Sequence, residues 1–384
     1  MILLTLCAVF FGSSGTYYLY MKQMTKKPWD LSTNEAYTPS IAILVPVHNE
    51  EKIIQLKLKN LDKVDYAIDK TEIIIVDDAS TDTTLAEIEA YMTSKSHKRI
   101  RILSMQEHLG KTNCMNLALK SVNAEVVVVS DADCFWPSNI LKKSLPYLCD
   151  ATVGAVAGSE LLLNPKSSWV TVGEELFDKT VTSIRVGESK VYSTIFSYGG
   201  FSAYKRAVLD EFDHAVDDAG TALNLVQKGF RTLLLSEVGF YTPFPIAWKN
   251  KIALKIRRTS QLQRLWIKCL KLLVQGKLKL PKRIAIPEIL LFVFNPPLLV
   301  ALAVVSVFAF ALNPVFLVFF LFLFILALLL QKTRRIMFQV LENNFIALAA
   351  LTTFFRKRSF LLWNTVQESR LLLTEEMLKQ KDLI

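Results

Sequence analysis

The chain has 384 residues, of which 52% are hydrophobic, and it carries a formal net charge of +10. Its mean hydropathy of +0.32 is high for a wholly soluble protein, and its length allows two or three domains. The basic charge suits an anionic membrane face or a phosphorylated substrate, whereas we expect no nucleic-acid partner because much of the excess lies beside apolar segments. The five cysteines are scattered without metal-ligand spacing, so we expect them to be reduced and structural.

The first apolar segment, residues 1–21, predicts a transmembrane helix because it is nearly uncharged and long enough to cross a bilayer. A cleaved signal peptide fits poorly, because Lys22, Lys26 and Lys27 follow the run and no basic residue precedes it. By the positive-inside rule, this charge places the residues that follow in the cytoplasm.

Between residues 39 and 245, short apolar stretches alternate with helical patterns, which predicts an α/β domain with a parallel sheet. The expected strands are IAILVPV, EIIIVDDAS, RIRILSM and VVVVSDAD, and the expected helices are EEKIIQLKLKNL, TLAEIEAYMTS, KTNCMNLALKSV and NILKKSLPYL. Ligands of such sheets bind beyond the carboxyl ends of the strands. Polar residues cluster at those ends, namely His48, Asn49 and Glu50, then Asp77 and Asp78, then Asp131 and Asp133.

Asp131 and Asp133 follow a run of four valines, so the two carboxylates stand where a buried strand ends. Carboxylates in this position can hold a hard divalent cation, whose other ligands are water and phosphate oxygens of a substrate. The sequence has no GxxxxGK[ST] loop and no GxGxxG after the first strand, so the common backbone cradles for phosphate are missing. We therefore expect a metal ion and basic side chains to meet the charge of a substrate diphosphate.

Seven motifs occur in order along the chain. They are VPVHNEE (45–51), VDDASTDTT (76–84), LGKTNCMNLAL (109–119), SDADCFWP (130–137), YGGFSAYKR (198–206), VDDAGTALNLVQKGFRTLLLSE (216–237) and RRTSQLQRLW (257–266). In order and spacing they resemble the membrane-integrated, inverting glycosyltransferases of family 2. The resemblance covers Ile41 to Trp266 and implies a GT-A nucleotide-binding domain with a Rossmann-like, mostly parallel sheet.

The resemblance also implies site residues. The nucleoside pocket would be lined by Pro46, His48, Asn49 and Glu50. Asp78 would accept a hydrogen bond from the nucleotide base, and Lys111 would approach the diphosphate or the ribose. Asp133 would be the main ligand of Mg²⁺ or Mn²⁺, with Asp131 contacting the ribose or a metal-bound water.

Further along, the acidic pair of the family is usually Glu-Asp and is Asp217-Asp218 here. The resemblance implies Asp218 as the general base that deprotonates the acceptor hydroxyl, and the alternative, Asp217, stays open. Gly199 and Gly200 either permit a turn or let the backbone approach the substrate closely.

Residues 246–283 predict basic amphipathic helices at the membrane interface, because no Asp or Glu occurs between Glu237 and Glu288. One face would lie on the membrane, namely Leu262, Trp266, Cys269 and Leu273. The other face would reach a diphosphate through Arg257 or Arg258, Gln261 and Arg264. In the family a tryptophan follows the arginine of the Gln-x-x-Arg pair directly, but Leu265 intervenes before Trp266, which puts the stacking of Trp266 at the acceptor end in doubt.

The apolar residues 284–331 predict two transmembrane helices, because Asn313-Pro314 divides the run into two lengths that each span a bilayer. Residues 336–384 predict a third transmembrane helix or an interfacial helix, followed by a C-terminal tail. The expected protein is therefore a multi-pass protein of the cell membrane with a cytoplasmic catalytic domain.

Together these features predict a glycosyltransferase that moves a sugar from a nucleotide-sugar donor, expected to be UDP-linked, to a membrane lipid. The acceptor would be a polyprenyl phosphate or a glycolipid headgroup. One alternative is a processive polysaccharide synthase, but the expected membrane helices are few for a polymer channel within one chain. Another is a non-catalytic membrane adaptor, which would be expected to have lost Asp133 or Asp218. The sequence leaves open whether the chain forms a homodimer through its membrane helices.

Overall fold

The computed structural model describes residues 2–95, 99–355 and 367–384, which cluster into two compact units. The first, here called the helical unit, comprises Met1–Gln23 and Ile252–Arg358. The second, here called the sheet unit, comprises Met24–Lys251 and Ser359–Ile384. The sheet unit thus joins the central part of the chain to its last residues.

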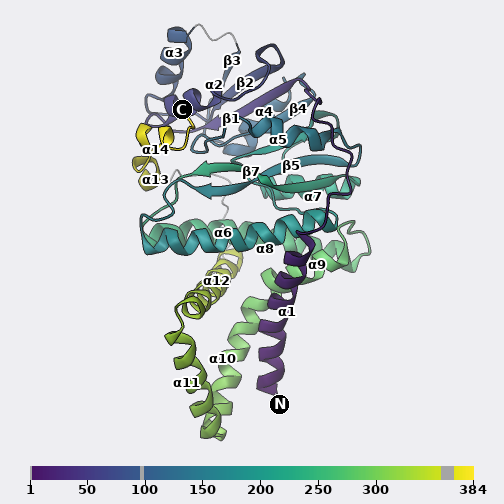
Figure 1. Cartoon of the computed structure of the whole chain (residues 1–384), viewed down its shortest axis with the longest axis vertical. Helices are drawn as coiled ribbons and strands as arrows, with labels where there is room; N and C mark the ends of the chain where they lie inside the picture. The colour runs from purple at the N-terminus through teal and green to yellow at the C-terminus, as the bar shows by residue number, and fades with distance from the viewer. Residues whose placement is uncertain (1, 96–98, 356–366) are drawn as a thin grey trace. The chain divides into compact units, whose positions relative to one another are not determined.

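The sheet unit is built on a seven-stranded sheet in the order β3-β2-β1-β4-β6-β5-β7 (Figure 1). Four strands run parallel, namely β1 (Ile41–Val47), β2 (Thr71–Asp77), β3 (Ile100–Ser104) and β4 (Val126–Val129). The other three are β5 (Val153–Leu162), β6 (Ser202–Lys205) and β7 (Arg231–Thr242). β6 is antiparallel to both β4 and β5, whereas β5 and β7 are parallel. The prediction of a mostly parallel α/β sheet is confirmed.

Helices connect these strands. They are α2 (Ile54–Asp62), α3 (Thr84–Lys95), α4 (Lys111–Leu119), α5 (Ile140–Ser144), α6 (Trp169–Val191) and α7 (Asp217–Lys228). Short 3₁₀ turns cover Ile68–Lys70, Leu145–Cys149 and Arg206–Val208. α2 begins four residues later than the expected helix at Glu50. The reason is that the backbone amides of Glu50 and Glu51 donate to the side chains of Thr84 and Asp82, which draws them into the loop.

Both faces of the sheet are buried, which explains why its strands read as continuous apolar runs. In β1, Ile41, Ile43 and Val45 belong to one core cluster, whereas Ala42 and Leu44 belong to the cluster on the opposite face. The four valines of β4 divide in the same alternating way. Such a sheet places its side chains rigidly, so the loops at its carboxyl edge start from fixed points.

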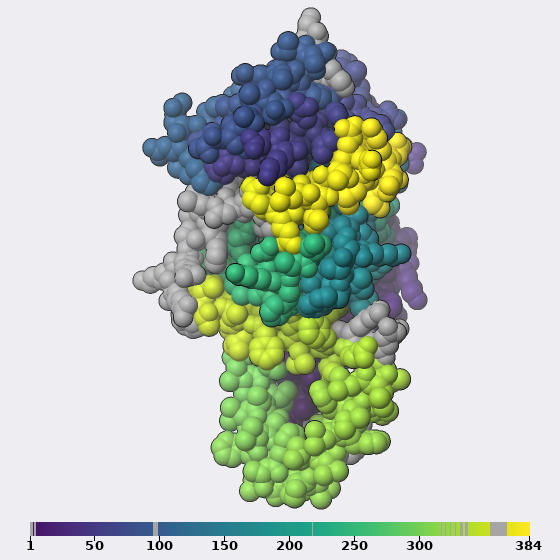
Figure 2. All heavy atoms as spheres, turned by 90° about the vertical axis from the view of Figure 1, so that its left-hand side faces the viewer, coloured from purple at the N-terminus to yellow at the C-terminus, as the bar shows by residue number. Residues whose placement is uncertain are grey.

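The C-terminal segment, residues 367–384, packs on the sheet unit through α13 (Gln367–Leu371) and α14 (Glu375–Lys379). Figure 2 shows this segment in yellow against the purple and blue part of the unit. Its buried side chains Leu373, Leu378 and Leu383 join the same core cluster as Leu58 and Leu61 of α2. The sequence predicted only a tail here.

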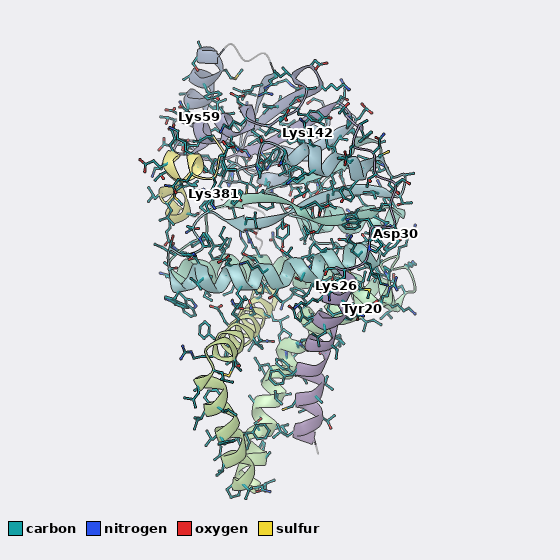
Figure 3. The ribbon with its side chains drawn as sticks, viewed as in Figure 1. Tyr20, Lys26, Asp30, Lys59, Lys142 and Lys381 are labelled. Atoms are coloured by element: carbon teal, nitrogen blue, oxygen red, sulfur yellow. The ribbon has the colours of Figure 1, made fainter. Side chains whose placement is uncertain are left out.

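Polar contacts fasten the same junction. The side-chain amide of Asn60 donates to the backbone carbonyl of Leu383, and Lys59 pairs with Glu375 at 3.2 Å. Lys381 lies over the ring of Tyr241 at 4.9 Å. Figure 3 labels Lys59 and Lys381 beside the C-terminal helices. Apolar burial and buried hydrogen bonds together make residues 367–384 part of the folded sheet unit.

The helices of the other part of the chain are α1 (Ile2–Met24), α8 (Trp248–Val274), α9 (Lys282–Ile289), a π-helical turn (Leu290–Phe294), α10 (Asn295–Leu312), α11 (Pro314–Leu329) and α12 (Gln331–Phe355). The predicted break at Asn313-Pro314 separates α10 from α11. Among the described residues, one helical stretch, Lys282–Leu312, is long and apolar enough to cross a membrane. The multi-pass arrangement stays a prediction.

Within the helical unit, α8 does not have the surroundings that we expected for it. Trp266 and Cys269 are fully buried, and Trp266 stacks on Phe292 with ring centroids 6.4 Å apart. Gln263 lies on the same side and donates to the backbone carbonyl of Ala347 at 2.8 Å. Phe292 and Ala347 come from segments that are distant from α8 in the sequence. The face of α8 predicted to rest on the membrane is therefore packed in part against protein.

We expect Leu378→Ala to destabilise the chain by about 2–4 kcal/mol, because it removes a fully buried side chain and leaves a cavity. The apparent Tm of the full chain in detergent would measure the loss. Leu371→Ala is the matched control, since that side chain is 66% exposed in the same segment and should change stability by less than about 0.5 kcal/mol. Equal Tm values for both variants would contradict the docking of the segment.

Candidate active site

The loops after β1 and β2 are joined by hydrogen bonds at the carboxyl edge of the sheet. The backbone amide of Asn49 donates to Ser80 Oγ at 3.0 Å, and Asn49 Oδ1 accepts from the backbone amide of Thr81 at 2.8 Å. His48 Nδ1 lies 2.7 Å from the backbone carbonyl of Asp78. These contacts bring together two of the predicted groups of polar residues.

Two residues of these loops have left-handed backbone conformations. Asn49 and Ala79 both have φ of 54°. Asparagine adopts this region readily, but alanine does so at a cost of order 1–3 kcal/mol. Such strain concentrates at functional sites, where the surrounding structure enforces it. The β1 and β2 loops are thus held in one defined shape.

Asp78 is fully buried and organises the loop that leads into α4. Its two carboxylate oxygens accept hydrogen bonds from the backbone amides of Leu109 and Gly110, each at 2.8 Å. The ring of His108 in that loop stacks on His48, with centroids 3.9 Å apart. Asp78 therefore fixes the start of α4. Its predicted contact with a nucleotide base stays a prediction.

The loop after β4 is held from beneath by a buried lysine. Lys57 of α2 donates from Nζ to Ser130 Oγ at 2.6 Å and to the backbone carbonyl of Cys134 at 2.5 Å. It also lies 4.7 Å from the ring centroid of Trp136. Burial lowers the pKa of Lys57 to about 8. This one side chain fastens both ends of the loop that carries Asp131 and Asp133.

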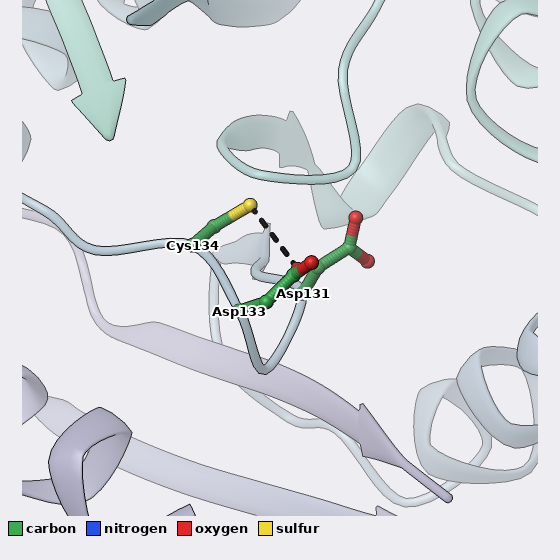
Figure 4. A group of neighbouring side chains, drawn as sticks. All are labelled: Asp131, Asp133 and Cys134. Carbon is green, nitrogen blue, oxygen red and sulfur yellow. Dashed lines mark hydrogen bonds between the residues drawn. The ribbon is translucent and has the colours of Figure 1, made fainter. Parts of the chain in front are cut away.

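Asp131, Asp133 and Cys134 form a cluster of possible metal ligands, in which the ligand atoms lie within 4.8 Å of one another (Figure 4). Burial, together with the carboxylates of Asp133 and Asp131, raises the pKa of the Cys134 thiol well above its usual range. A thiol is a poor ligand, whereas carboxylates suit hard cations. The donor set therefore fits Mg²⁺ or Mn²⁺ held through the two aspartates.

Lys111, the first residue of α4, links the β4 loop to α7. Its Nζ lies 2.8 Å from Asp131 Oδ1 and 3.6 Å from Asp218 Oδ2. The predicted general base and one predicted metal ligand therefore share a single cation. Asp218 is in the first turn of α7, while the side chain of Asp217 lies outside the described residues.

Gly199 and Gly200 close the same site from the other side. The backbone carbonyl of Gly199 accepts from the amide of Asp131 at 2.9 Å. A Cβ atom at Gly199 would lie 2.1 Å from Lys111 Nζ, and one at Gly200 would lie 2.1 Å from the ring of Phe240. A side chain at Gly199 would thus displace the ends of polar site side chains, whereas one at Gly200 would meet a ring of the core.

Arg370 of the C-terminal segment reaches this site, which sequence reasoning missed. Its Nε and Nη2 donate to the two oxygens of Glu50 at 3.1 and 2.7 Å, and its Nη1 donates to Asp133 Oδ2 at 2.7 Å. Glu50 is buried, and burial raises the pKa of its carboxyl to about 7 even though Arg370 opposes the shift. No motif surrounds Arg370, and 237 residues separate it from Asp133.

The remaining predicted residues are divided between the units. Pro46 is buried within β1, beside the loop of His48, Asn49 and Glu50. The others belong to the helical unit as part of α8, namely Arg257, Arg258, Gln261, Arg264 and Trp266. Their contact with a diphosphate or an acceptor stays a prediction.

Comparison with known proteins places this site in an enzyme class. Residues 42–212 match the family described as glycosyl transferase family 2. The chain is 28% identical to the mannosyltransferase PcManGT from Pyrobaculum calidifontis, which was solved in complex with GDP-Man and Mn²⁺. The two structures superpose with a TM-score of 0.77, covering 93% of this chain and 99% of that one. Part of the sheet unit therefore resembles family 2 domains, and the mannosyltransferase is similar to nearly the whole chain.

Curated relatives match over shorter stretches. A beta-monoglucosyldiacylglycerol synthase from Synechocystis is 29% identical over 157 residues, or 40% of this chain and 33% of that protein. A poly-beta-1,6-N-acetyl-D-glucosamine synthase from Staphylococcus aureus is 25% identical over 250 residues, or 61% of this chain and 56% of that protein. The chain thus matches between a third and little more than half of these relatives. The match to the family 2 model and the similarity to these enzymes support its assignment as a glycosyltransferase.

The two glycines should respond differently to the same substitution. We expect Gly199→Ala to displace Lys111 from Asp131 and to lower kcat for sugar transfer by about 100-fold, since small misplacements at a reacting centre cost that much. Its Tm should change little, because the end of a lysine side chain can move. Gly200→Ala should instead lower stability by about 1–3 kcal/mol, because Phe240 is buried and cannot yield. A normal kcat in Gly199→Ala would contradict the role given to the Lys111 contacts.

Proposed function

We propose that the protein is an inverting, metal-dependent glycosyltransferase that moves a sugar from a nucleotide-diphosphate sugar to a membrane lipid. One observation carries the proposal. Lys111 lies between Asp131, in the carboxylate cluster after β4, and Asp218, at the start of α7. Sugar transfer needs carboxylates that can hold a metal ion at the donor and a carboxylate base at the acceptor, and both must lie within one site.

The roles of the chain's residues follow from what sugar transfer requires. Asp133 and Asp131 would hold Mg²⁺ or Mn²⁺, which supplies Lewis-acid neutralisation of the leaving diphosphate. The ammonium of Lys111 adds positive charge on the same side and keeps the Asp218 carboxylate oriented. When the acceptor attacks through a hydroxyl group, Asp218 takes its proton as that oxygen bonds to the anomeric carbon and the diphosphate leaves. The oxygen of a polyprenyl phosphate is already ionised and needs no such base. Attack from the face opposite the diphosphate inverts the configuration of the sugar.

For the donor, both uridine and guanosine diphosphate sugars are candidates. The resemblance in the sequence favours a UDP-sugar. The Pyrobaculum mannosyltransferase, which matches nearly the whole chain, was solved with GDP-Man and Mn²⁺. This match supports GDP-mannose as a donor to be tested beside UDP-glucose and UDP-N-acetylglucosamine, with Mn²⁺ as the first metal.

For the acceptor, we favour a lipid such as a polyprenyl phosphate or a glycolipid headgroup. The Synechocystis relative is named for a glucolipid product, and the apolar helical stretch Lys282–Leu312 is long enough to anchor the chain in a membrane. From the hydropathy and charge pattern of the sequence, we propose that the enzyme lies in the cell membrane as a multi-pass protein with the sheet unit on the cytoplasmic side. A processive synthase is the second candidate, since the Staphylococcus relative is named for a polymer product.

The proposal is tested by donor turnover with the purified full chain in detergent, supplied with membrane lipid extract and Mn²⁺. We expect labelled sugar in the lipid phase, lost on addition of EDTA. Asp133→Asn and Asp218→Asn should each lower kcat by at least about 100-fold, because each removes a group needed at the reacting centre. Asp210→Asn is the matched control, as the Asp210 side chain is 76% exposed, and should keep wild-type turnover.

Other outcomes point elsewhere. Long water-soluble polymer in place of labelled lipid would favour the synthase. Metal-dependent nucleotide binding without turnover of any donor would indicate a non-catalytic adaptor. Full activity in Asp218→Asn would contradict its role as the base and would point to Asp217.

A further inference from the structure

The C-terminal segment brings a guanidinium group to the donor side of the site. Arg370 makes two hydrogen bonds to Glu50, which follows β1, and one to Asp133, which follows β4. Its side chain is only 12% exposed. Bidentate contacts between a planar guanidinium group and a carboxylate fix the orientation of the carboxylate and also compensate its charge. A residue from the far end of the chain thus determines how two acidic side chains of the sheet edge are oriented.

The segment around Arg370 is held firmly by independent contacts. Glu368 accepts hydrogen bonds from the backbone amides of Ile246 and Ala247 at 3.2 and 2.9 Å, and from the side-chain amide of Asn250 at 2.5 Å. On the other side, Leu373 and Leu378 are buried in the core cluster of the sheet. Withdrawing Arg370 together with its segment would break these contacts and expose apolar surface. This packing indicates that the segment is a permanent part of the site and not a plug that is released.

The hydrogen bond from Arg370 engages only one oxygen of Asp133. Oδ2 accepts from Arg370, whereas Oδ1 lies 3.6 Å from Cys134 Sγ, within the cluster that includes Asp131. Two of the three hydrogen bonds of Arg370 go to Glu50, and the third fixes the rotation of the Asp133 carboxylate.

We propose that Arg370 is a positioning residue that orients Asp133 for metal binding, so that residues 367–384 complete the active site. This inference rests on the proposed function only in taking Asp133 as a metal ligand. Arg370 acts through Asp133 and Glu50 and is not assigned any contact with substrate. Partners that orient metal ligands typically change metal affinity or activity 10–100-fold when they are removed.

The test is Mn²⁺ binding to the full chain in detergent, followed by the electron paramagnetic resonance signal of free Mn²⁺, with and without UDP or GDP. We expect Arg370→Met to raise the Kd for Mn²⁺ by about 10–100-fold. Arg370→Lys should recover only part of the affinity, because an ammonium group keeps the charge but cannot reproduce the planar set of hydrogen-bond donors of a guanidinium group. Lys379→Met is the control in the same segment, since that side chain is 62% exposed, and should bind Mn²⁺ as the wild type does.

A second variant separates positioning from stability. Arg370→Met leaves Glu50 buried without its partner, so the variant is expected to lose stability as well. Adding Glu50→Gln removes the buried carboxyl group that has lost its partner, and it should restore much of the Tm without restoring Mn²⁺ affinity. Recovery of Mn²⁺ affinity together with Tm would overturn the proposal, because it would show a purely structural role.

Three further results would overturn the inference. Tighter Mn²⁺ binding and faster turnover in Arg370→Met would mean that Arg370 blocks the site. Wild-type affinity in Arg370→Lys would mean that charge alone matters. Absence of Mn²⁺ binding by the wild-type chain would remove the metal ligand on which the inference rests. The proposed function fails separately, if the wild type binds Mn²⁺ through Asp133 but transfers no sugar from any donor.

Discussion

The structure of the site depends on how negative charge is compensated at the carboxyl edge of a buried sheet. Carboxylates that leave dry strands lose hydration, and this loss costs free energy unless a nearby cation or hydrogen-bond donor compensates for it. Lys111 serves Asp131 and Asp218, and Arg370 serves Glu50 and Asp133. Because each cation joins acidic groups from different segments, the same contacts that compensate the charge also fix the geometry of the site.

The supporting fold explains why these cations stand where they do. The Asp78 carboxylate accepts hydrogen bonds from the backbone amides of Leu109 and Gly110. These bonds fix the start of α4 and therefore the position of Lys111. Lys57 anchors the loop after β4 through its hydrogen bonds to Ser130 and Cys134, although burial disfavours the charged form of this lysine. The acidic edge is thus backed by a second layer of polar contacts, so that a donor would meet an arrangement already formed.

Much of the sheet unit could be predicted because its signals are local. Strands such as Ile41–Val47 and Val126–Val129 are continuous apolar runs, and the motifs that follow them occupy adjacent residues of the chain. Prediction failed where burial depends on distant neighbours. The amphipathic pattern of α8 does not distinguish lipid from protein, and the structure places Trp266 against Phe292.

By itself the sequence determined the α/β sheet, the break between α10 and α11, and which acidic residues follow which strands, because each depends on a few consecutive residues. Only the tertiary structure decided that Lys111 bridges Asp131 and Asp218, and that residues 367–384 return to the sheet to place Arg370 between Glu50 and Asp133. Contacts between different segments depend on how the whole chain packs, and no local pattern encodes them.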